Sequence, residues 1–65
     1  MKYNIGDLLE YTRKTINGTH HLLIKNVIEV GHTLCYEFMN LTNGYDVNVA
    51  VSTVDAEKSG YTKIA

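Results

Sequence analysis

The side chains that could carry out catalysis are few and scattered along this 65-residue chain. Cys35 with one of the three histidines could form a nucleophile and base pair, in which the imidazole removes the thiol proton. A lone cysteine within a strand is more commonly a small buried apolar side chain. Because so small a domain has little room for a concave site where several reactive groups converge, we expect no enzymatic activity.

The adjacent histidines His20 and His21 suggest a metal site. In a regular strand, however, neighbouring side chains point to opposite faces, so the pair cannot hold one ion. His32 lies at a predicted turn, where it could join either of them. Three histidines dispersed in this way are more typical of surface positions, and we expect neither a metal nor a cofactor.

Fixed charge is unevenly distributed along the chain. Residues 11–28 contain three basic residues and no carboxylate, whereas the rest carries enough acids to bring the net charge to −1. The two adjacent histidines add positive charge when protonated, so this segment could attract a small anionic ligand such as a nucleotide. The alternative is a solvated hairpin tip. With an exposed aromatic beside the second hairpin, the candidate ligand-binding residues are Arg13, Lys14, His20, His21, Lys25 and Tyr45.

The overall charge argues against an extended nucleic-acid interface. The pI is about 6.2, whereas a domain that binds many phosphates of a duplex is strongly basic. Single-stranded nucleic acid is a weaker alternative, for which Tyr36, Phe38 and Tyr45 would offer stacking planes. Tyr36 and Phe38 share parity with Leu34, and at least one of the two is expected to fill the core, whereas Tyr45, next to a glycine, is expected to be exposed.

Apolar alternation and turn residues predict a chain made mostly of short strands. Asn17-Gly18 and Asn43-Gly44 are strong hairpin signals, because both residue types tolerate positive φ. The segment 20–30 also has apolar residues at helical spacing, but its four β-branched residues favour a strand. The expected elements are strands at 8–12, 20–30, 33–41, 45–52 and 61–64, with one helical turn within 53–59.

The period-2 alternation also predicts which side chains share a face of the sheet. The four expected groups are Ile5, Leu9 and Tyr11; Leu22, Ile24, Ile28 and Val30; Leu34, Tyr36 and Phe38; and Tyr45, Val47, Val49 and Val51. Further apolar residues fall on the opposite face, namely Leu23 and Val27 in one strand and Cys35, Met39 and Leu41 in another. One small sheet cannot bury both of its faces, which favours a homo-oligomer or a larger protein partner.

This order of elements resembles that of the SH3-like small β-barrels. The resemblance rests on Ile5-Gly6-Asp7-Leu8-Leu9-Glu10-Tyr11 at the front, and on Val54-Asp55 and Tyr61-Thr62-Lys63-Ile64 at the back. It implies an all-β, five-stranded antiparallel barrel, in one domain over residues 1–65, with a helical turn before the last strand. The acidic and tryptophan-rich features with which signalling SH3 domains capture proline-rich peptides are missing here, so that activity is not carried over.

Residues 36–44 followed by 51–55 also look like the short barrels encoded in bacteriophage genomes. That resemblance implies a small accessory protein that acts by binding or sequestering something from a host. The first residues contain no apolar leader segment, and no stretch approaches the roughly 18 apolar residues of a membrane span. A lone cysteine suits a reducing compartment, so we expect a cytoplasmic protein.

Together these observations predict a non-enzymatic binding module. Its leading interpretation is a homo-oligomer that binds or sequesters an anionic small molecule, such as a nucleotide, through the basic first hairpin. The alternative is an adaptor or inhibitor that docks on a larger host protein through Leu23, Val27, Met39 and Leu41, with the charges only steering the encounter.

Overall fold

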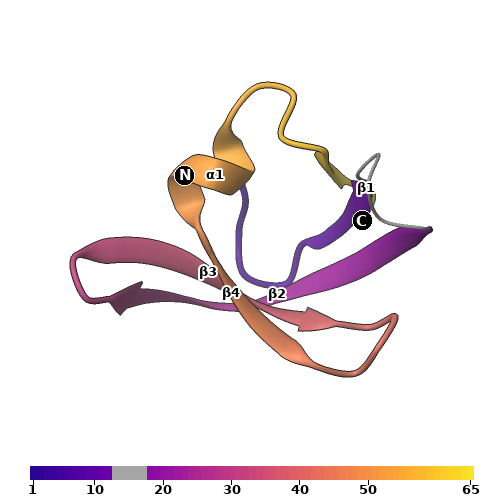
Figure 1. Cartoon of the computed structure of the whole chain (residues 1–65), viewed down its shortest axis with the longest axis horizontal. Helices are drawn as coiled ribbons and strands as arrows, with labels where there is room; N and C mark the ends of the chain where they lie inside the picture. Colours follow the sequence, from indigo (N-terminus) through magenta and orange to yellow (C-terminus); the bar gives the residue numbers. More distant parts are fainter. Residues whose placement is uncertain (13–17) are drawn as a thin grey trace.

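The fold is a five-stranded antiparallel sheet with one short helix (Figure 1). The computed structural model describes residues 1–12 and 18–65. In sheet order β4-β3-β2-β1-β5, every neighbouring pair of strands is antiparallel. The five predicted strands and the helical turn before the last one are therefore confirmed. The elements are β1 (Leu8–Thr12), β2 (Thr19–Val30), β3 (Thr33–Asn40), β4 (Asp46–Ala50), α1 (Val51–Asp55) and β5 (Tyr61–Lys63).

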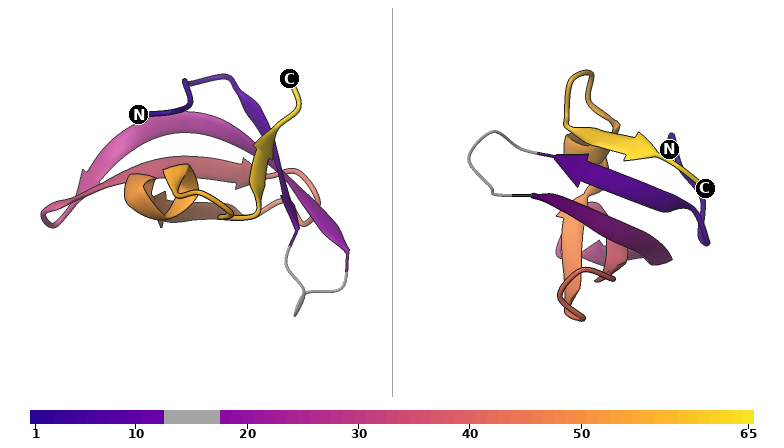
Figure 2. Two further views of the ribbon diagram at one scale, coloured as in Figure 1. Left: turned by 90° about the horizontal axis from the view of Figure 1, so that it is seen from above. Right: turned by 90° about the vertical axis from the view of Figure 1, so that its right-hand side faces the viewer.

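The long strand β2 belongs to both halves of the sheet. Its first residues, Thr19–Leu23, pair with β1, while residues from Leu22 to Val30 pair with β3. Figure 2 shows the resulting curvature, with α1 on the concave side of β2 and β3. The sheet nevertheless remains open, which differs from the closed barrel that the sequence suggests. In the described part of the chain its edge strands β4 and β5 are not paired with each other, and α1 with the short segment after it connects them.

A β-bulge in β2 changes which of its side chains face the core. The register shifts between Ile24 and Asn26, so that Lys25 is an extra residue with no partner in β3. Leu22 and Ile24 are buried before the bulge, and Val27 packs against the core after it. The prediction that Ile28 and Val30 continue the face of Leu22 is therefore wrong, and Val27 takes that position.

The concave side of the sheet holds the core. Buried side chains come from the N-terminal segment, from the three central strands and from α1. The expectation that at least one of Tyr36 and Phe38 fills the core is confirmed, since both are fully buried. Leu9 is buried too, but Ile5 is 61% exposed and Leu34 also lies outside. The core consists of Tyr3, Leu9, Leu22, Ile24, Tyr36, Phe38 and Val54.

The chain leaves the sheet earlier than the alternation indicates. β4 ends at Ala50, and Val51 begins α1 rather than continuing the strand. In a helix, residues three apart lie on one face, so Val51 and the fully buried Val54 both reach the core. The helical turn expected within 53–59 therefore begins earlier, at Val51, and ends at Asp55. Starting the helix at Val51 directs this side chain to the core.

The convex face carries a different set of apolar side chains from the one expected. Leu23 and Met39 are half-buried partners across β2 and β3, and Cys35 is buried opposite Ile28. Because Val27 points to the core, it does not contribute to the surface proposed for a partner. Among the described residues, no helix is long and apolar enough to cross a bilayer.

Asp55 connects α1 to the start of the chain. Its carboxylate accepts hydrogen bonds from the Tyr36 hydroxyl at 2.8 Å and from the Lys2 main-chain N–H at 2.9 Å. The same hydroxyl accepts from the Tyr3 N–H at 3.2 Å. Burial, together with the hydrogen bond to Asp55, raises the pKa of Tyr36. These contacts hold the helix and the N-terminal segment over β3.

Candidate functional site

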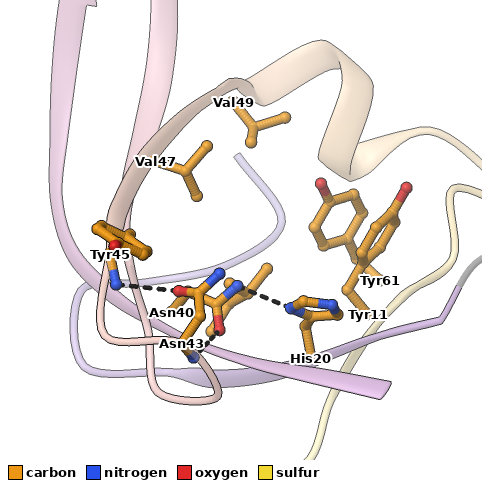
Figure 3. Close-up of a pocket in the computed structure, with 9 residues that line it drawn as sticks. Tyr11, His20, Asn40, Asn43, Tyr45, Val47, Val49 and Tyr61 are labelled. Carbon is orange, nitrogen blue, oxygen red and sulfur yellow. Dashed lines mark hydrogen bonds between the residues drawn. The ribbon is translucent and has the colours of Figure 1, made fainter. Parts of the chain in front are cut away.

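A pocket of about 260 Å³ lies on the concave side of the sheet, between its two open edges. All five strands and the β3–β4 hairpin contribute to its lining (Figure 3). Aromatic, aliphatic and amide side chains surround it, and no lysine, arginine or carboxylate is among the described residues that line it. These residues are Tyr11, His20, Leu22, Asn40, Asn43, Tyr45, Val47, Val49 and Tyr61.

Stacked tyrosines form one wall of the pocket. Tyr11 and Tyr61 are partners across β1 and β5, and their rings stack with centroids 4.3 Å apart and an interplanar angle of 26°. The buried Phe38 ring lies nearly parallel to Tyr61, at 6.0 Å, and supports it from the core. Tyr45 is 74% exposed at the other end of the pocket, beyond Asn40 and Asn43 in Figure 3. Flat aromatic surfaces are therefore present at both ends.

Gly60 allows the aromatic wall to form. Its φ is +90°, and a Cβ at this position would lie 2.7 Å from the Thr12 carbonyl oxygen and 3.4 Å from the Tyr11 ring. The Thr12 N–H donates to the Gly60 carbonyl at 3.2 Å. Only glycine fits this close approach, which aligns β5 beside β1 and thereby places Tyr61 against Tyr11.

Amide side chains form the polar side of the pocket. Asn40 is only 8% exposed, and its Oδ1 accepts hydrogen bonds from the main-chain N–H groups of Thr42 (2.9 Å) and Asn43 (3.3 Å). Its Nδ2 lies 2.9 Å from His20 Nδ1. Asn43 Oδ1 in turn accepts from the Tyr45 N–H at 2.9 Å. Asn40 and Asn43 therefore fix the shape of the β3–β4 hairpin as well as lining the pocket.

The structure brings two of the six predicted ligand-binding residues together. His20 and Tyr45 both line the pocket, and the expected exposure of Tyr45 is confirmed. His21 points to the opposite face of the sheet, where its Nε2 lies 4.0 Å from a Glu10 carboxylate oxygen. Arg13 and Lys14 lie outside the described residues.

Lys25 is engaged in an ion pair away from the pocket. Its Nζ lies 2.8 Å from Asp46 Oδ2, and this hydrogen bond raises the pKa of Lys25. The carboxylate of Asp46 in β4 therefore largely offsets the positive charge of Lys25. Of the basic residues that the sequence groups together, the described ones form no common patch with the pocket.

Several lining residues were missed by the sequence analysis. Asn40 and Asn43 were assigned only to a strand end and a turn, because nothing in a single sequence distinguishes an amide that lines a pocket from one that caps a hairpin. The parity of Tyr11 with Leu9 indicates that Tyr11 lies on the same face as Leu9. No sequence signal indicates that Tyr61 lies opposite Tyr11, since the register of β1 with β5 depends on the whole fold.

The groups considered for catalysis or metal binding do not converge. Cys35 is buried, with its Sγ 3.7 Å from the Thr33 carbonyl oxygen on the side of β3 that faces away from the pocket. Within residues 1–12 and 18–65, no three histidine, cysteine or acidic side chains are grouped so as to hold a metal ion. What the pocket offers chemically is stacking surface, apolar contact and hydrogen bonds.

Comparison of the chain with protein-family models, with curated proteins and with solved structures gave no match.

Proposed function

We propose that this protein is a non-enzymatic binding module that holds a planar ring, such as the base of a nucleotide, in the concave pocket. The observation that carries the proposal is the stacked pair Tyr11 and Tyr61, which faces the exposed Tyr45 across an apolar and amide lining. Stacking of a base on an aromatic side chain contributes about 1–3 kcal/mol. Such contacts suit any flat heterocycle, because each has a π-face.

The size and charge of the pocket support a ring rather than a larger ligand. Pockets for drug-sized molecules run to about 300–1,000 Å³, so a volume of about 260 Å³ suits one ring system. The lack of charged side chains among the described lining residues suits an uncharged group. The phosphate of a nucleotide would then extend beyond the pocket. Arg13 and Lys14, which directly follow β1 in the sequence, are our candidates for its countercharge.

The experiment is a comparison of ring binding by Tyr45 variants. Tyr45→Ala removes a stacking surface from a side chain that is mostly exposed, so folding should be unaffected. We expect its affinity for nucleoside monophosphates, measured by titration calorimetry, to fall about 5- to 150-fold, which corresponds to 1–3 kcal/mol. Tyr45→Phe keeps the ring and should bind like the wild type.

Leu34→Ala is the matched control for loss of an exposed apolar side chain, because Leu34 does not line the pocket. It should leave affinity unchanged. If the wild-type protein binds no nucleotide or nucleoside at millimolar concentration, the proposal is wrong.

The edge strand β4 supports a second proposal, which is self-association. β4 is an edge strand, with no further strand on its outer side among residues 1–12 and 18–65, and Val47 is 41% exposed. Residues Asp46–Ala50 contain neither lysine nor proline, which commonly protect edges against pairing. We propose that two copies pair through β4, which would place the pockets of both copies next to each other because Val47 and Val49 line them.

A further inference from the structure

The imidazole and amide side chains that line the pocket, those of His20, Asn40 and Asn43, have mainly hydrogen-bond donors left for a ligand. This follows first from Asn40, whose side-chain oxygen accepts from two main-chain N–H groups, those of Thr42 and Asn43. A main-chain N–H can only donate, so these two bonds fix which end of the amide is the oxygen. Asn40 Nδ2 must then be the atom that faces His20 Nδ1 at 2.9 Å.

The orientation of Asn40 determines the tautomer of the neutral His20 ring. An amide nitrogen can only donate, so His20 Nδ1 accepts this hydrogen bond and carries no proton. The proton of the neutral imidazole is therefore on Nε2, which is a donor. In Figure 3 the His20 ring lies between Asn40 and Tyr11, at the edge of the aromatic wall.

Asn43 adds a further donor. Its Oδ1 accepts from the Tyr45 N–H at 2.9 Å, which leaves the two hydrogens of Nδ2. No hydrogen bond from Asn43 Nδ2 occurs within the described part of the chain. Each acceptor atom of the His20, Asn40 and Asn43 side chains therefore already receives at least one hydrogen bond from the protein. What they can still offer a ligand is N–H groups.

We infer that the pocket selects rings whose edge presents adjacent hydrogen-bond acceptors over rings whose edge presents an amino group. Among nucleobases, guanine has this pattern at O6 and N7, whereas adenine places an amino donor beside N7. An amino group opposite the amide and imidazole donors would leave both sides unpaired and desolvated. This inference rests on the proposed function, because it specifies the ligand of the same pocket.

The test measures the affinities of uncharged nucleosides, so that phosphate electrostatics do not enter. Inosine carries O6 and N7 like guanosine but lacks the 2-amino group, and 7-deazaguanosine replaces N7 by a carbon. We expect guanosine and inosine to bind about 5- to 150-fold more tightly than adenosine, with 7-deazaguanosine weaker than guanosine. Calorimetry or a competition assay gives the dissociation constants.

The Asn43→Asp variant tests the donors directly. It keeps an oxygen that can accept from the Tyr45 N–H but replaces the Nδ2 donor by a second acceptor. We expect the preference for inosine over adenosine to shrink or invert. The control is Asn48→Asp, which adds the same charge at an exposed position in β4 that does not line the pocket, and which should keep the wild-type preference.

The outcomes separate this inference from the proposed function. Equal binding of inosine and adenosine by the wild type would overturn the inference and leave ring binding in place. A preference that is unchanged in Asn43→Asp would also overturn the assignment of the donors. If no nucleoside and no nucleotide binds, both proposals are wrong.

Discussion

At the scale of single residues, the Tyr36 hydroxyl is the polar group on which the interior depends most. It donates to Asp55 at 2.8 Å and accepts from the Tyr3 N–H at 3.2 Å, so it joins β3, α1 and the N-terminal segment. Its ring is fully buried. A substitution that removes only the hydroxyl would leave the Asp55 carboxylate and the Tyr3 N–H without this partner, while the ring would still pack in the core.

We predict that Tyr36→Phe lowers the free energy of unfolding by about 1–2 kcal/mol, because a hydrogen bond to a partly exposed carboxylate is lost. Urea denaturation followed by circular dichroism measures this loss. Tyr45→Phe removes a hydroxyl from an exposed side chain and should cost nothing measurable. Equal effects of the two substitutions would contradict the role given to Tyr36.

The raised pKa of Tyr36 also predicts a pH dependence. A group with a higher pKa in the folded state than in the unfolded state stabilises the fold fully below the unfolded value, about 10 for tyrosine. That contribution is lost as the pH rises through the folded pKa. The wild type should therefore lose stability above about pH 10 more steeply than Tyr36→Phe. Parallel stability profiles for the two proteins would contradict the account.

Sequence reasoning found two pocket residues for physical reasons that can be stated. Tyr45 follows a hairpin glycine, where a large side chain is commonly exposed. His20 belongs to the basic first hairpin, to which it adds positive charge when protonated. Sequence reasoning assigned Lys25 to the same site because neighbouring positive charges look like a patch. The structure instead pairs Lys25 with Asp46, 21 residues away along the chain, and no local pattern reveals such a contact.

At the scale of elements, Gly60 sets the alignment of β5 with β1. A side chain at this position would both require an unfavourable φ of +90° and collide with the Thr12 carbonyl oxygen. Gly31 offers a comparison, since its φ is +64° but a Cβ there would meet open space. A side chain at Gly31 would therefore cause backbone strain alone, whereas a side chain at Gly60 would cause both strain and a steric collision.

We predict that Gly60→Ala lowers the free energy of unfolding by about 1–3 kcal/mol and weakens ring binding, because Tyr61 can no longer stack on Tyr11. Gly31→Ala should cost less and leave binding unchanged, since it lies in the β2–β3 turn away from the pocket. Denaturation and ligand titration of both variants measure the two effects. A Gly31→Ala variant that loses as much affinity would refute this role of Gly60.

The predicted elements match the observed ones best where the pattern depends only on local periodicity. The alternation in β3 places Tyr36 and Phe38 on one face, with at least one of them expected in the core, and both are fully buried. The bulge at Lys25 was not predictable, because an extra residue in a strand shows only in its pairing with β3. The same holds for the change from β4 to α1 at Val51, which is favoured by packing of the helix on the core.

At the scale of the whole molecule, the open edge of β4 is the feature that the SH3-like resemblance did not predict. The Asn40 N–H donates to the Tyr45 carbonyl at 2.8 Å. Because bonded pairs alternate along an antiparallel ladder, Val47 and Val49 bond to β3, and the main-chain groups of Asn48 point to the open side. An edge of this kind can pair with a second copy.

We predict that Asn48→Pro abolishes self-association while the fold is kept, since it removes an outward-pointing N–H that β3 does not use. Native mass spectrometry and light scattering measure the mass in solution. Asn48→Thr retains the N–H and should assemble like the wild type. A wild-type protein that is monomeric at all concentrations would refute pairing through β4.

The central claim, that the concave pocket binds a planar ring, is tested most directly by titrating the isotope-labelled wild-type protein with inosine and recording its amide NMR shifts. We expect saturable changes that cluster at the pocket, at Tyr11, His20, Asn43, Tyr45 and Tyr61, with little change at His21 and Lys25 on the other face. Shifts confined to that other face, or no shifts at millimolar inosine, would contradict the claim.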